Sequence, residues 1–204
     1  QLTLLITFLA AVFTSSFTVQ MKEKARLSQQ DAYRSGVILD TSQMLQKAAA
    51  PADILTCTAI QLNKLLKRDI TCFEQDGAGL KSPLCFREYS SPATGRGPAP
   101  DTLEELTAAR KCFQEGKETG AATGLFTAAA YHFLPLQSSC AVYGVMGIHV
   151  GPTPPGDFET SLQVAIIAQC SMALEKEYIS MKREVEAATV SPEQHRSHPP
   201  SSTH

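Results

Sequence analysis

Apolar and polar positions divide the chain into a long uncharged run, a series of short periodic segments and a polar tail. Leu2–Val19 holds no charged residue across its 18 positions. A helix rises about 1.5 Å per residue, so this run would span about 27 Å, close to the hydrocarbon thickness of a bilayer. We therefore expect residues 1–20 to form a transmembrane helix.

Basic residues follow this run directly. They are Lys22, Lys24, Arg26 and Arg34. Basic residues beside a span stay on the cytoplasmic side, which predicts a cell-membrane protein whose later residues are cytoplasmic. The same cluster can attract anionic membrane lipid, although topology determination explains most of it equally well. Two alternatives are a signal peptide, which carries its basic residues before the apolar run, and a buried core helix, which usually shows a polar face.

Helical periodicity predicts four helices beyond this run. Residues 21–50 form a juxtamembrane signalling helix, and Pro51 begins a second helix at a position that favours proline. A third covers Leu103–Gln114, where Gly116 provides a left-handed end. The fourth is apolar at first and becomes charged from residue 175, so residues 175–189 are expected to project from the domain as an outgoing signalling helix.

Alternating segments predict an antiparallel sheet between these helices. Residues 69–79 form a strand that closes on an Asp-Gly turn, and residues 82–90 provide its partner. Residues 129–137 and 141–150 form the clearest hairpin. Strand alternation places four residues of its second strand on one face. They are Tyr143, Val145, Gly147 and His149. The order of elements indicates an α+β fold.

Composition excludes several classes of function. The net charge of −2 provides no basic surplus for nucleic acid, so we expect no nucleic-acid partner. Six cysteines occur without a C-x-x-C pair, which argues against a zinc or thioredoxin-like motif. Most of them lie within apolar runs, which favours buried free thiols in a reducing compartment over disulfides. We expect neither a metal nor a cofactor. The Pro-, Ser- and His-rich residues 190–204 are predicted to be disordered.

The most specific pattern is an aromatic residue, a Gly-x-x-x-Gly-x-x-Thr loop, an LPL run and a YGV strand. Its residues are Phe113, Gly116, Gly120, Thr123, Leu134, Pro135, Leu136, Tyr143, Gly144 and Val145. The pattern resembles the KdpD-type potassium-responsive sensor histidine kinases, with Cys112 where that family usually has Trp. The resemblance extends over roughly residues 1–188, with the segment ILDTSQML in the corresponding order.

This resemblance implies a GAF-like sensor domain over residues 51–174, preceded by one transmembrane helix. It implies a fragment that relays a potassium or osmotic signal to a kinase core, and a homodimer formed through the terminal helices. A response regulator would be reached only through that core. The phospho-accepting histidine motif and the ATP-binding boxes of the family do not occur in these residues, so the fragment itself is expected to be non-catalytic.

Two further functions remain open. Tyr131, Phe133, Tyr143 and His149 could line a GAF-type pocket for a cyclic nucleotide or another small molecule, or could simply pack the sheet against its helices. Cys112 and Cys140 could act as in GAF-fold reductases, although Arg110 and Lys111 are the only basic neighbours that could lower a thiol pKa. Gly116 and Gly120 are predicted to serve the backbone, by permitting positive φ.

Overall fold

The computed structural model describes residues 29–87, 102–121, 123–139, 141–151, 153 and 155–190. The chain divides into two compact units, Gln1–Asp40 and Thr41–His204. The predicted membrane run, the first three basic residues after it and residues 191–204 lie outside the described residues. Among the helices that are described, none combines the length and apolar character needed to cross a bilayer.

The first unit contributes one described segment, the helical residues 29–40. Most of its side chains are exposed, including Arg34 of the basic cluster. In the second unit, residues 41–47 are helical, and Thr41 and Leu45 are buried.

One antiparallel sheet forms the centre of the second unit. Its strands are β1 (Ile70–Asp76), β2 (Gly79–Leu80), β3 (Leu84–Phe86), β4 (Thr119–Gly120), β5 (Tyr131–Gln137) and β6 (Val142–His149). The order is β2-β1-β6-β5-β4, and β3 also pairs with β1. The predicted partner of the first strand and the predicted hairpin are therefore confirmed, as is the α+β class.

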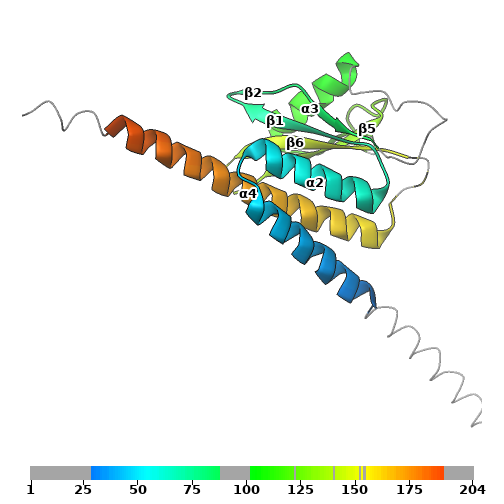
Figure 1. Ribbon diagram of the computed structural model, residues 1–204. Coiled ribbons are helices and arrows are strands. Elements are labelled where there is room, and N and C mark those ends of the chain that lie inside the picture. The colour runs from blue at the N-terminus through cyan, green and yellow to red at the C-terminus, as the bar shows by residue number, and fades with distance from the viewer. Residues whose placement is uncertain are drawn as a thin grey trace, which may run out of the picture. The chain divides into compact units, whose positions relative to one another are not determined.

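Helices cover both faces of this sheet (Figure 1). The helices α2 (Pro51–Leu66) and α4 (Asp157–Val190) pack together on one face, and α3 (Leu103–Glu115) packs on the other. We call these the α2–α4 face and the α3 face. Thr102 caps α3, because its hydroxyl accepts from the Glu105 backbone N–H at 3.2 Å.

The two faces have different cores. On the α2–α4 face the large buried helix residues are aliphatic: Ile54, Leu55, Leu62, Leu162, Ile166 and Leu174. On the α3 face the cluster combines rings from the strands with small side chains from α3: Phe73, Ala108, Ala109, Cys112, Tyr131, Phe133 and Val145. Burial of a side chain such as Leu or Phe contributes about 1.5–3 kcal/mol, so both faces hold the domain together.

A register shift in the hairpin corrects one prediction from the sequence. Pro135 pairs with Val145 and Leu136 with Gly144, but Gln137 pairs with Val142, which leaves Tyr143 as an extra residue. Its ring stacks on Tyr178 of α4 and not among the residues of the α3 face. The prediction that Tyr143 shares a face with its neighbours two residues along was wrong, because the bulge breaks the two-residue period there.

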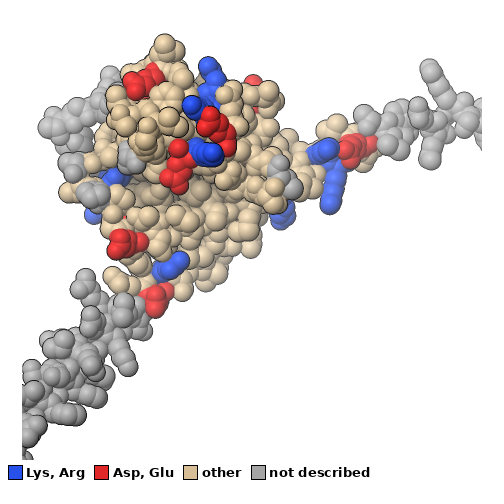
Figure 2. All heavy atoms as spheres, turned by 180° about the vertical axis from the view of Figure 1, so that it is seen from behind, with Lys and Arg blue, Asp and Glu red and all other residues tan. Residues whose placement is uncertain are grey.

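Burial along α4 stops well before the helix does. Leu174 is fully buried and Tyr178 is half-buried, whereas the side chains of residues 179–188 are all exposed. Figure 2 shows charged side chains of both signs on this projecting end, which includes Lys182, Arg183 and Glu184. The last described turns of α4 therefore project beyond the sheet.

Candidate functional site

The structure brings together three of the four residues proposed to line a ligand pocket. The Phe133 ring lies 6.2 Å from Phe73 and 6.1 Å from Tyr131, centroid to centroid, and Tyr131 meets His149 edge-on at 5.4 Å. Phe133 is fully buried and Tyr131 nearly so. Tyr131 and Phe133 belong to the core cluster that packs against α3, so in this structure their rings fill the core and line no cavity between them.

Tyr131 carries no charge at neutral pH. Burial raises the pKa of its hydroxyl to about 12, and the nearby carboxylate of Asp69 adds to the shift. The ring therefore acts as an apolar core element that keeps its proton.

The glycines of the family-like pattern are backbone devices. Gly116 has φ +62° and ends α3, where its N–H donates to the Cys112 carbonyl at 2.9 Å. Gly120 has φ +92°, and a Cβ at this position would overlap the Tyr131 carbonyl oxygen. Gly116 therefore lies in the left-handed region that favours glycine, and the backbone overlap at Gly120 excludes a side chain there.

Other residues of the pattern hold the same loop and strands. The Thr123 hydroxyl lies 2.7 Å from the Gly120 carbonyl and 2.8 Å from that of Leu125, which closes the turn after β4. A Cβ on Gly144 would lie 2.5 Å from the Phe73 carbonyl oxygen, so β6 approaches β1 closely there. Phe113 is half-buried against the α3-face cluster. These residues of the pattern therefore have structural roles in the sheet and its loops.

The described cysteines are free thiols: Cys57, Cys72, Cys85, Cys112 and Cys170. Burial raises the pKa of Cys112 to about 12, and the negative charge of Glu118 adds to the shift. A reactive cysteine needs a lowered pKa and solvent access, and Cys112 has neither. Cys140 lies outside the described residues. Among the described residues, no cluster of three or more His, Cys, Asp or Glu side chains is placed to hold a metal.

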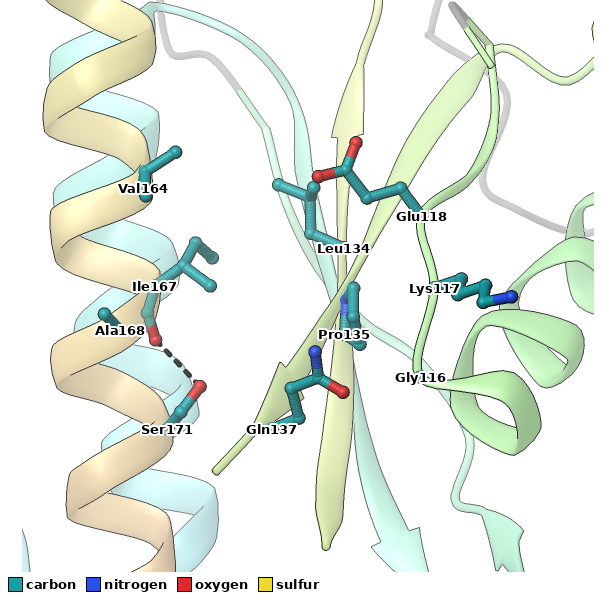
Figure 3. Close-up of a pocket in the computed structure, with 10 residues that line it drawn as sticks. All are labelled: Gly116, Lys117, Glu118, Leu134, Pro135, Gln137, Val164, Ile167, Ala168 and Ser171. Carbon is teal, nitrogen blue, oxygen red and sulfur yellow. Dashed lines mark hydrogen bonds between the residues drawn. The ribbon is translucent and has the colours of Figure 1, made fainter. Parts of the chain in front are cut away.

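A groove of about 460 Å³ opens between α4 and the edge of the sheet (Figure 3). We call it the edge groove. One wall comes from α4 and the other from β5, and the segment Gly116–Glu118 closes one side. The α4 residues are Val164, Ile167, Ala168 and Ser171, and the β5 residues are Leu134, Pro135 and Gln137. None of the four residues predicted to line a pocket lies in it. Val164 and Pro135 are distant in sequence, so no local pattern marks the groove.

A second groove of about 330 Å³ lies between the helical residues 41–47 and α4. It is lined by Ser42 and Leu45 from the helical residues 41–47 and by Gln169, Met172 and Ala173 from α4, among others. The end of the helix that enters the domain therefore lies beside α4. It does so close to the point where α4 loses its contacts with the sheet.

Two contacts fasten α4 at that point. The Ser138 hydroxyl, in the turn between β5 and β6, donates to Glu175 Oε1 at 2.6 Å. Tyr143 stacks on Tyr178 with ring centroids 5.5 Å apart and planes within 16°. Burial raises the pKa of Tyr178 to about 12, and the nearby Glu74 carboxylate adds to the shift. We call these two contacts the exit latch.

The second unit has the fold of a GAF domain. The crystal structure of the GAF domain of the potassium sensor histidine kinase KdpD from Escherichia coli matches with a TM-score of 0.54 at 18% identity, covering 76% of this chain and 99% of that one. The GAF domain of the Acinetobacter phosphoenolpyruvate-protein phosphotransferase matches with a TM-score of 0.50 at 12% identity, covering 74% and 98%.

Sequence comparison agrees with one of these matches. The chain is 22% identical over 196 residues to the sensor protein KdpD of Clostridium acetobutylicum, which covers 94% of this chain. The chain spans 21% of the length of that relative. No family model matches the sequence. The resemblance to KdpD sensor proteins and the GAF-like fold are thus supported by independent comparisons.

Proposed function

We propose that this chain is the sensory relay segment of a KdpD-like sensor histidine kinase, in which the GAF-like domain passes a conformational signal through α4 to a kinase core. The observation that carries the proposal is the change along α4, which is packed on the sheet as far as Leu174 and exposed over residues 179–188. A helix that is docked at one end and free at the other can transmit a rotation or a shift of the domain that holds it.

The input side supports the same mechanism. Leu45 is only 7% exposed and lines the groove shared with α4, so a displacement of residues 41–47 would act on α4 directly. Coupling requires an element with two arrangements that both sites bias. We assign that element to the exit latch, because a hydrogen bond and a ring stack fasten α4 there, whereas the earlier turns of α4 are held by buried aliphatic side chains.

Insertions in the exposed part of α4 test the relay. Each added residue rotates everything beyond it by about 100°. We therefore expect one to seven alanines inserted after residue 179, in a protein that carries a KdpD-type kinase core after α4, to make autophosphorylation rise and fall with helical phase. Seven residues nearly complete two turns and should restore the original activity, which provides the internal control. Activity that falls steadily with insert length, without recovery, would rule the mechanism out.

We also propose a homodimer through the terminal helices. Met181 and Val185 lie four residues apart on one face of α4, at 44% and 65% exposure. Apolar side chains on an exposed helix at this spacing can form a seam with a second helix. Replacing both with Glu should shift the molecular mass measured by light scattering from dimer to monomer, and replacing the exposed Ser180 with Glu should not.

The last part of the proposal is that the chain is attached to a membrane and responds to a potassium or osmotic stimulus. Its support is the uncharged run at residues 1–20, the basic residues that follow it and the similarity to KdpD sensor proteins. On this view the GAF-like domain is cytoplasmic, the stimulus is potassium or osmotic, and a response regulator acts only through the kinase core. Autophosphorylation in vesicles at low and high potassium would test the stimulus, and equal activity at both would exclude it.

A further inference from the structure

The edge groove plays no part in the relay mechanism, and its walls fit a small molecule. Val164 is 61% exposed and Ile167 is partly exposed, and both side chains point into the groove toward Leu134 and Pro135 (Figure 3). A volume of about 460 Å³ lies within the range of small-molecule sites, which are mostly apolar with a few polar groups that fix the ligand.

The edge of the sheet at this groove does not suit an added strand. The Ala121 N–H donates to the Tyr131 carbonyl, and the Val150 N–H donates to the Ala130 carbonyl, both at 2.9 Å. Odd-numbered residues of β5 therefore turn their backbone groups toward β4 and the open edge. Pro135 belongs to this set and has no N–H, so an incoming strand would lose a hydrogen bond there. An occupant must be recognised through side chains.

The charges at the groove favour a cation. Two charged residues line it, and the Glu118 side chain turns toward Leu134 while the Lys117 side chain points away toward α3 (Figure 3). Glu118 Oε2 lies 3.1 Å from His132 Nε2, and the Glu118 side chain is 61% exposed. Its other carboxylate oxygen accepts no hydrogen bond from the described residues and is open to a ligand. The Gln137 amide and the Ser171 hydroxyl supply neutral polar groups farther along.

We propose that the edge groove binds a small organic ammonium, with an apolar body between α4 and β5 and the ammonium on Glu118. The shape supplies the apolar contacts, and the carboxylate supplies a charge-assisted hydrogen bond. This proposal goes beyond the relay and stands without it, because binding is measured on the chain itself and needs no kinase activity.

Phenethylammonium is a suitable probe, since 3-phenylpropionate and 2-phenylethanol keep the ring and replace the charge. Titrated into the ¹⁵N-labelled chain, the ammonium should produce saturable amide shifts in residues 116–118 and 164–171 and in Leu134, Leu136 and Gln137. The carboxylate should produce none, and the alcohol should bind at least tenfold more weakly. Equal shifts with all three probes, or shifts that map elsewhere, would overturn the proposal.

Variants separate the charge from the shape. Glu118→Gln should weaken the ammonium at least tenfold, and Ala168→Phe should abolish binding by filling the groove. Glu104→Gln changes an exposed carboxylate in the first turn of α3 and should leave the affinity unchanged. Thermal melts establish whether each variant is folded. If Ala168→Phe does not fold, the comparison of Glu118→Gln with wild type tests the proposal by itself. Undiminished binding to folded Glu118→Gln would refute the role of the carboxylate.

Discussion

The two faces of the sheet are built by different means. On the α3 face, rings from the strands meet the small side chains of Ala108, Ala109 and Cys112, so a short helix lies close to the sheet over an aromatic layer. On the α2–α4 face, branched aliphatic side chains fill the space between the strands and two long helices. The first arrangement makes a closed core, and the second leaves one helix free to continue past the domain.

This difference assigns separate tasks to the faces. Tyr131 and Phe133 are buried in the cluster of the α3 face, so a ligand could enter that cluster only by displacing one of them. A change on the α2–α4 face acts directly on α4. The edge groove and the exit latch both lie along α4. In the proposed relay, the signal would pass through α4, and the α3 face would serve stability.

Alkaline pH should remove the largest amount of stability. Burial raises the pKa of Cys72, Cys112 and Cys170 to about 12 from 9.0. The folded state keeps protons that the unfolded state releases, so the contribution is fully present below pH 9 and is lost as pH rises toward 12. Each thiol accounts for roughly 4 kcal/mol at the alkaline limit, against a total of about 5–15 kcal/mol for a domain. We expect unfolding, followed by circular dichroism, before pH 12.

Replacing one cysteine at a time compares how much each face of the sheet contributes to the alkaline transition. Cys112 belongs to the α3 face, while Cys170 lies on α4. Cys112→Ala and Cys170→Ala should each move the alkaline midpoint upward, and together they should move it further. A midpoint that stays fixed in both variants would mean that these thiols do not control the transition.

Truncation of the Phe133 ring should cause the second largest loss of stability. Phe133→Ala removes a fully buried side chain that contacts two other rings, and such changes cost about 3–5 kcal/mol. The cavity would be apolar, and such cavities can bind benzene. Chemical denaturation with and without benzene measures both effects. Leu136→Ala, on the other side of β5, is the matched control and should lose about 2–5 kcal/mol without gaining a benzene site of the same shape.

Local signals in the sequence predicted the elements well. The start of α2 was predicted from a proline at residue 51, the end of α3 from a glycine at residue 116, and the hairpin from its apolar alternation. These signals worked because caps, turns and strand faces depend on neighbours along the chain. The position of Tyr143 could not be predicted this way. Its ring is placed by a bulge and by Tyr178, 35 positions later in the printed sequence.

The candidate site was harder to predict for the same reason. Four residues were proposed from one hairpin, and the structure assigns three to the α3 face and one to the exit latch. The edge groove is formed by β5, α4 and the segment after α3, which meet only in the folded chain. Sequence reasoning could have noticed Val164, an apolar residue outside the buried seam of α4.

A close contact on the α3 face gives a smaller effect. A Cβ on Gly147 would lie 2.5 Å from Thr71 Cγ2 and 2.8 Å from Phe133 Cε1. Both are side-chain atoms in a filled core, so Gly147→Ala should cost about 1–3 kcal/mol through overpacking. The double variant Gly147→Ala/Phe133→Leu should lose less than the two single losses together, since the smaller side chain relieves the overlap. Simple additivity would show that the ring is not what limits the space.

The exit latch should have the smallest effect on stability and the most local one. Ser138→Ala removes the hydroxyl that donates to Glu175, a contact between partly buried groups worth about 1 kcal/mol. Hydrogen exchange should accelerate in the turns of α4 around residue 175 and remain unchanged near Leu162, which is held by the aliphatic core. Glu175→Gln keeps an acceptor and should fall between wild type and Ser138→Ala, while Ser180→Ala, at an exposed position, should match wild type. Uniform acceleration along the whole helix would mean that α4 responds as one rigid body, and the separate exit element on which the relay depends would then be lost.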